Sequence, residues 1–77
     1  MNIKQREDEV LRSFITRFNK KALSIDEVDD KILVIAFMNR LRKGKFLFSL
    51  YKNDPMTMSN VLYRATKYIN VEDVLLA

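Results

Sequence analysis

The sequence predicts one small all-α domain, a four-helix bundle spanning residues 1–77. The chain contains one Gly and one Pro, too few for the many turns of a β-rich fold. Apolar residues recur at helical spacing in several segments. With 77 residues, the chain is long enough for one domain with a marginal core, since a domain of this size buries only about 60% of its unfolded surface.

The first predicted helix runs from about Glu7 to Leu23. At about 100° per residue its apolar side chains share one side of the helix. These side chains are Val10, Leu11, Phe14, Ile15 and Phe18. Acidic residues 7–9 in the first turn and lysines 20 and 21 in the last turn both suit the helix dipole. A short polar connection, residues 24–29, is expected to follow.

The second predicted helix runs from Asp29 or Asp30, a plausible N-cap, to Arg42. Its seven consecutive apolar residues, 32–38, also suit a buried strand. A helix is the better interpretation, because the segment exceeds the usual strand length and no second strand is available. One apolar arc contains Leu33, Val34, Phe37 and Leu41, and a second contains Ile32, Ile35, Met38 and Asn39.

The two arcs leave two interpretations of this helix open. It is either a central helix wrapped on all sides, or a helix with one face in the core and one against a partner. The small size of the domain favours the second. We therefore predict dimerisation through Ile32, Ile35, Met38 and Asn39. Micromolar affinity is expected, since a modest apolar patch contributes several kcal/mol at roughly 25 cal/mol per Å2 before association costs.

A basic cluster follows the second helix and surrounds Gly44, the predicted C-terminal cap. Its members are Arg40, Arg42, Lys43 and Lys45. The cluster is either a solvated helix end or a phosphate contact, and the spacing of a phosphate-binding loop is absent. No aromatic side chain is predicted to be exposed for base stacking. RNA contact is therefore expected to be weak and strongly salt-dependent.

Two further helices complete the predicted bundle. The third spans about Lys45 to Lys52 and ends before Pro55, since Pro disfavours helical geometry in the preceding residue. The fourth starts after Thr57, a good N-cap, and carries a clear apolar stripe up to Asn70. Beyond it the pattern blurs, so residues 71–77 are expected to fray or to pack on something outside this sequence.

The composition argues against an enzyme. There is no Cys and no His, which excludes disulfides, zinc knuckles and thiol or imidazole catalysis. No group of residues suggests a catalytic, metal or cofactor site, and none is predicted. The net charge of +4 permits weak contact with nucleic acid. No apolar run reaches the ~18 residues of a membrane span and no secretory leader is evident, so a soluble cytoplasmic domain is expected.

One stretch resembles a known motif. The order and spacing of residues 5–18 resemble the major homology region of retroviral and retrotransposon capsid proteins, which lies in the C-terminal domain of the capsid part of Gag. The matching residues are Gln5, Glu9, Leu11, Phe14, Ile15, Arg17 and Phe18. Retroviral members usually have Gly after the Gln, where this chain has Arg6. Retrotransposons of the gypsy class often lack that Gly.

The rest of the chain is similar to the Gag domain of gypsy-type retrotransposons. The similarity lies in Ala36-Phe37 with Leu41, in Arg-x-Gly-Lys-Phe from Arg42 to Phe46, and in Ala-x-Lys-Tyr-Ile from Ala65 to Ile69. Where most relatives have Gly-Leu before the basic turn, this chain has Arg40-Leu41.

The resemblance implies a structural role and a hydrogen-bond network. The expected function is a capsid-type domain that forms dimers and higher assemblies, in an intracellular virus-like particle. In the family, residues corresponding to Gln5, Glu9 and Arg17 tie the entry loop to the first helix. Such pairing also has a physical basis, because a charge beside a buried face is tolerated only when paired. Two alternatives stay open: a basic nucleic-acid-binding module, and a domesticated Gag domain that binds another protein's peptide or helix.

Overall fold

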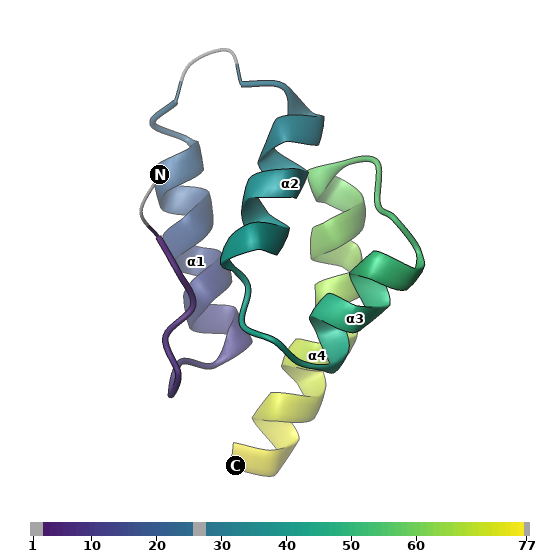
Figure 1. Ribbon diagram of the computed structural model, residues 1–77. Coiled ribbons are helices and arrows are strands. Elements are labelled where there is room, and N and C mark those ends of the chain that lie inside the picture. Colours follow the sequence, from purple (N-terminus) through teal and green to yellow (C-terminus); the bar gives the residue numbers. More distant parts are fainter. Residues whose placement is uncertain (1–2, 26–27, 77) are drawn as a thin grey trace.

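The computed structural model describes residues 3–25 and 28–76, and these contain four helices and no strand (Figure 1). The helices are α1 (Leu11–Ala22), α2 (Asp30–Arg40), α3 (Lys45–Lys52) and α4 (Met58–Leu76). The predicted all-α class and small four-helix bundle are confirmed.

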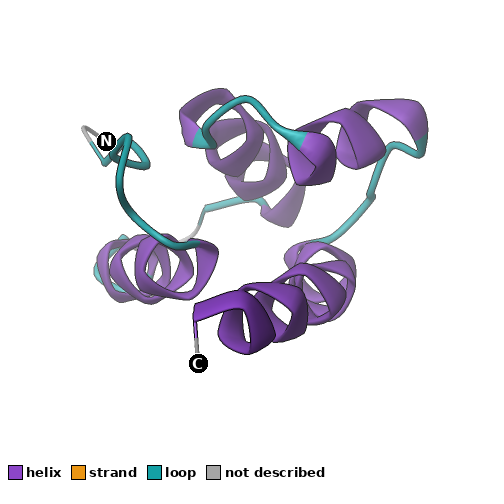
Figure 2. Ribbon diagram, turned by 90° about the horizontal axis from the view of Figure 1, so that it is seen from below, coloured by secondary structure: helices purple, strands orange, loops and turns teal. Residues whose placement is uncertain are grey.

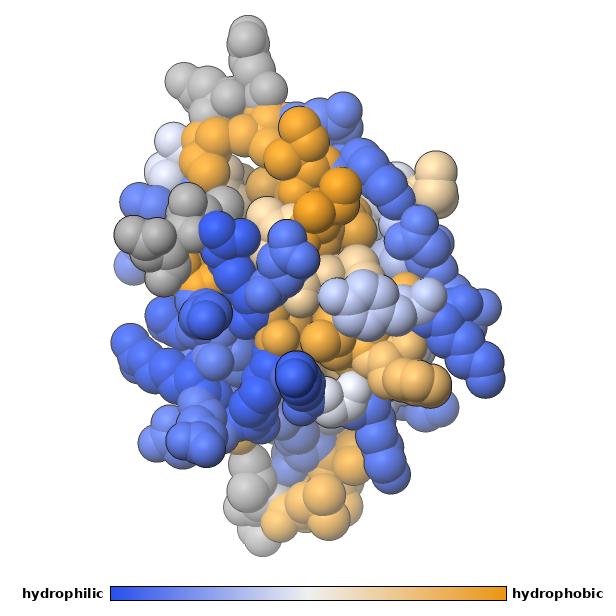
Figure 3. All heavy atoms as spheres, viewed as in Figure 1, coloured by the Kyte–Doolittle hydropathy of each residue, from blue (hydrophilic) through white to orange (hydrophobic). Residues whose placement is uncertain are grey.

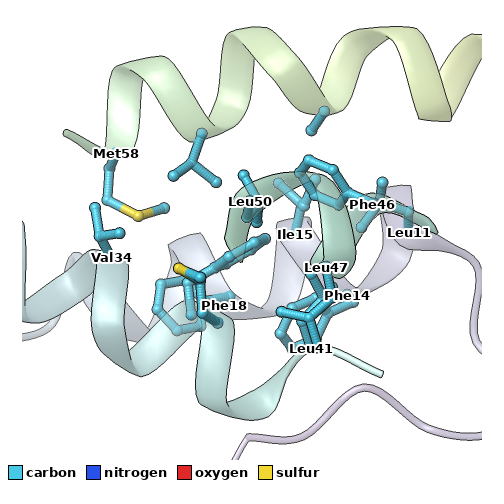
Figure 4. Close-up of a cluster of buried hydrophobic side chains, with 14 residues drawn as sticks. Leu11, Phe14, Ile15, Phe18, Val34, Leu41, Phe46, Leu47, Leu50 and Met58 are labelled. Carbon is cyan, nitrogen blue, oxygen red and sulfur yellow. The ribbon is translucent and has the colours of Figure 1, made fainter. Parts of the chain in front are cut away.

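The helices form two layers around one core. Seen from below, α2 and α3 lie on one side of the molecule, and α1 and α4 lie on the other (Figure 2). Apolar side chains from all four helices meet between the layers (Figure 4). The core therefore depends on every helix, as expected where no single pair of helices can bury enough surface.

Aromatic rings link the layers. The ring of Phe37 in α2 lies 5.3 Å from that of Phe14 and 5.2 Å from that of Phe18, both in α1. It lies 6.3 Å from the ring of Phe46 in α3, which in turn lies 4.9 Å from Tyr68 in α4. Aromatic pairs at these distances add to the stabilisation from their burial. Phe37 is fully buried at the centre of this chain of rings.

The first helix begins later than predicted. Glu7 and Asp8 lie in a turn, and Val10, with extended backbone, is the N-cap of α1. The first turn of α1 contains no acidic residue, so the expected interaction of residues 7–9 with the helix dipole is wrong. The reason is that the Glu9 carboxylate is used in a network of specific hydrogen bonds, described below.

The turn between α2 and α3 also differs from the prediction. Asp29 is the N-cap of α2, where its carboxylate accepts from the backbone N–H of Lys31 at 3.0 Å, as expected. The helix ends at Arg40, two residues early, with Leu41 as its C-cap. Gly44 is not a C-terminal cap: its backbone is extended, with φ 169°, and it immediately precedes α3.

The fourth helix starts as predicted and ends later. The Thr57 hydroxyl accepts from the backbone N–H of Asn60 at 3.1 Å, which confirms it as an N-cap. The helix then continues without a break to Leu76, so residues 71–76 of the predicted tail are helical. Ala77, and residues 26 and 27 of the predicted connection, lie outside the described part of the chain.

Candidate functional site

The candidate site is the segment before α1, where Gln5 connects three parts of the chain. Its backbone N–H donates to the Arg40 carbonyl at 2.9 Å, and its side-chain oxygen accepts from the backbone N–H of Arg42 at 2.9 Å. Its side-chain Nε2 donates to the Glu9 carbonyl at 3.0 Å. Gln5 therefore holds the entry loop against the end of α2, and it supplies an acceptor to the turn that leads to α3.

Glu9 is the centre of the network. Its side chain is only 5% exposed, and its carboxylate accepts from the backbone N–H of Arg6 at 3.1 Å and from the Ser13 hydroxyl at 2.9 Å. Arg17 donates to both carboxylate oxygens, from Nε and Nη2, at 2.7 Å each. This bidentate geometry is the strongest form of a guanidinium–carboxylate contact. The structure thus brings together all three predicted network residues.

These contacts keep both Glu9 and Arg17 charged. The hydrogen bonds from Arg17 lower the pKa of Glu9 from 4.5 to about 2, against the opposing effect of burial. The hydrogen bond to Glu9 raises the pKa of Arg17. Nη2 of Arg17 also donates to the Lys4 carbonyl at 2.7 Å. A carboxylate with this pKa and these partners stays ionised at neutral pH, so it suits a structural role.

A second carboxylate, that of Glu72, completes the start of α1, and sequence reasoning missed it. The backbone N–H of Leu11 donates to both oxygens of Glu72, at 2.9 and 3.2 Å, across 61 positions of sequence. Next to it, Asp73 pairs with Arg12. Glu72 is half-buried and has a structural role, because the N-terminal N–H groups of a helix lack partners within it and Glu72 supplies one.

Of the four residues of α2 that were predicted to face a partner, three are exposed to solvent. Ile32 is 58% exposed and Ile35 is 50% exposed, and Asn39 is exposed beside them. Met38 is buried, so its assignment to this face is wrong. At about 100° per residue, Met38 lies about 40° from Val34, which is fully buried, but about 120° from Ile32. We define the outer face of α2 as Ile32, Ile35 and Asn39.

The four residues of the basic cluster divide into two kinds. Arg40 donates to the Ala36 carbonyl at 3.3 Å. Arg42 donates to the carbonyls of Arg6, at 3.0 Å, and Glu7. The two lysines, 43 and 45, are exposed and form no ion pair with a described residue. Arg42 therefore helps to hold the turn before α1, Arg40 contacts a carbonyl of its own helix, and the two lysines are available to a ligand.

The expectation that no aromatic side chain is exposed is wrong. Phe48 is 70% exposed, Tyr51 is 63% exposed and Tyr63 is 80% exposed. Tyr51 lies at helical spacing with buried residues of α3, yet it faces solvent. An eight-residue helix offers only one side to the core, and in α3 that side is taken by Phe46, Leu47 and Leu50.

Within residues 3–25 and 28–76, no three acidic side chains are arranged to hold a metal ion. None of the helices described is both long and apolar enough to cross a membrane.

No family model, curated protein or solved structure matches the chain. We therefore infer the function from the residues themselves.

Proposed function

We propose that this chain is a structural, non-enzymatic assembly domain of the capsid type, like those of gypsy-type Gag proteins, and that it self-associates through α2. The arrangement of Gln5, Glu9 and Arg17 supports this proposal. Three of the residues that match the major homology region form one connected network, with a partly buried bidentate ion pair at its centre. Chance agreement of the sequence pattern would not require their side chains to meet.

The observation that carries self-association is the outer face of α2. Figure 3 shows hydrophobic atoms over α2, in the centre of this side of the molecule, between hydrophilic margins. Ile32 and Ile35 expose half or more of their surface there. A domain with so small a core gains from covering such a face with a second copy. The patch is far smaller than a standard interface of about 1,600 Å2, which is consistent with weak, concentration-dependent association.

Sedimentation at several protein concentrations tests the proposal. Wild-type protein should shift from monomer to dimer over the micromolar range, whereas the Ile32→Asp/Ile35→Asp double variant should remain monomeric. The variant should stay folded, because both side chains already face solvent. Val74→Asp is the matched control: Val74 is 76% exposed at the other end of the molecule, and its replacement should leave the dimer unchanged.

Two results would contradict the proposal. If the wild-type protein remains monomeric at several hundred micromolar, the domain does not self-associate. Equal weakening of the dimer by the Val74 control would place the interface elsewhere. If the outer face instead bound another protein's helix, the isolated domain would sediment as a monomer, which is the outcome expected for a domesticated partner-binding domain.

A further inference from the structure

A second surface lies between α3 and α4, away from the outer face of α2. The two helices lie side by side (Figures 1 and 2), and Arg64 of α4 donates to the Ser49 carbonyl and hydroxyl of α3 at 2.7 and 3.0 Å. Three hollows follow this junction. The hollow beside the turn before α3 shares Lys67 and Tyr68 with the middle hollow. The middle hollow shares Ser49 and Arg64 with the hollow at the end of α3. Because neighbouring hollows share lining residues, they lie in a row along the junction, and we call this row the groove.

The groove is strongly basic. Arg42, Lys43 and Lys45 lie at one end, Lys67 lies in the middle, and Lys52 and Arg64 lie at the other end. The middle hollow, of about 550 Å3, has no acidic residue in its lining. Of the two carboxylates that line the ends, Glu72 accepts from Leu11 and Asp54 pairs with Lys31. The four lysines of the groove form no ion pair with a described residue.

An aromatic side chain lines the same groove. Tyr63 lies in the middle hollow with Lys67 and Arg64 and is 80% exposed. An exposed aromatic ring beside cations is a common arrangement for binding single-stranded nucleic acid, since the cations contact phosphates and the ring stacks on an unpaired base. From Asn60 to Glu72 the groove follows α4 for about 18 Å at 1.5 Å per residue. That length holds roughly five stacked nucleotides at 3.4 Å each.

We propose that the groove between α3 and α4 binds single-stranded nucleic acid, with phosphates at Lys43, Lys45 and Lys67 and a base stacked on Tyr63. An acidic peptide would use the lysines but would have no need of the exposed ring. A duplex offers no unpaired base to that ring. This proposal is independent of self-association, because it uses no residue of α2.

Fluorescence anisotropy with labelled ten-nucleotide oligo(U) and oligo(dT) tests this proposal. At low salt both should bind, and the logarithm of the binding constant should fall with the logarithm of salt with a slope of about −2, from three phosphates at about −0.7 each. Lys67→Gln should weaken binding and bring the slope about 0.7 closer to zero. Lys20→Gln is the control, because Lys20 is exposed near the end of α1 and does not line the groove.

The contribution of Tyr63 is tested separately. Tyr63→Ala should weaken binding about tenfold without changing the salt slope, and Tyr63→Phe should retain wild-type affinity. Circular dichroism should show that both variants are folded, since the side chain is exposed. Tighter binding of oligo(U) than oligo(dT) would indicate RNA as the ligand, and equal binding would indicate any single strand.

Four results would overturn the proposal. Absence of oligonucleotide binding at low salt would do so directly. Equal losses in Lys67→Gln and Lys20→Gln would mean that the groove is not the site. Unchanged affinity in Tyr63→Ala would mean that no base stacks on Tyr63 and that binding is non-specific charge neutralisation. Binding of a polyglutamate peptide or of a ten-base-pair duplex as tightly as the oligonucleotides would identify a general polyanion surface.

Discussion

At the start of α1, the hydrogen bonds of single residues are important for stability. The Glu9 carboxylate is a buried charge. It accepts hydrogen bonds from a guanidinium, a hydroxyl and a backbone N–H. Burial of such a charge would be costly without these partners. Loss of any one partner therefore affects the others, and the residues should behave as a unit.

We expect Glu9→Ala to destabilise the domain by about 1–3 kcal/mol, because it leaves buried donors without an acceptor. For a domain of this size, each kcal/mol lowers the melting temperature by about 4–8 °C. Arg17→Ala should also lower the melting temperature markedly. The double variant should lose less than the sum of the single losses, as measured by urea unfolding. Small, strictly additive losses would mean that the side chains act independently.

The lowered pKa of Glu9 predicts how stability depends on pH. Since the pKa is 4.5 ordinarily and about 2 in the folded state, the unfolded chain takes up a proton first as pH falls. The contribution of Glu9 is therefore fully present above about pH 4.5 and lost progressively toward pH 2. Urea unfolding of wild type and Glu9→Gln from pH 7 to pH 2.5 should show a stability difference that shrinks below pH 4.5. A difference that is constant across this range would contradict the assignment.

At the scale of elements, the helices are tied to one another at their ends. The Asp30 carboxylate, in the first turn of α2, accepts from the backbone N–H of Met58 at 3.2 Å, at the start of α4. Glu72, near the other end of α4, caps α1. Each carboxylate satisfies an N–H group that has no partner within its own helix. The helix ends thus hold the packing register of α4 against both neighbours.

We expect Glu72→Ala to destabilise the domain by about 1 kcal/mol, because α1 loses its only side-chain cap among the described residues. Asp73→Ala is the matched control. The ion pair between Asp73 and Arg12 has side chains 51% and 61% exposed, and such pairs contribute little. Thermal unfolding of the two variants should separate them by several degrees. Equal melting temperatures would mean that water replaces the cap.

At the scale of the whole molecule, a core drawn from all four helices leaves little stability in reserve. Periodicity found all four helices and most core positions, because each apolar stripe is a local pattern. It misplaced Met38, since an apolar residue at the edge of a wide stripe can face either way until its neighbours are known. It missed Glu72 because that residue's partner is 61 positions away. It did not show that Tyr51 faces solvent, because helical spacing alone does not show which side of a short helix the core covers.

We expect Met38→Asp to unfold the domain, because an unpaired charge would be placed in the core. Ile35→Asp places the same charge one turn earlier, at a side chain that is 50% exposed, and should leave the helical content intact. Far-ultraviolet circular dichroism of the two proteins at equal concentration measures the difference. A folded Met38→Asp protein would show that α2 can rotate about its axis in the bundle.

The cap that Glu72 provides has a consequence for biosynthesis. During translation, residues 3–25 leave the ribosome well before residue 72 is added, so the start of α1 is without its cap while most of the domain is already made. Contacts of such large sequence separation close late and slow folding. The nascent domain should therefore resist protease only after α4 has cleared the exit tunnel, and ribosomes stalled before that point should carry a protease-sensitive chain.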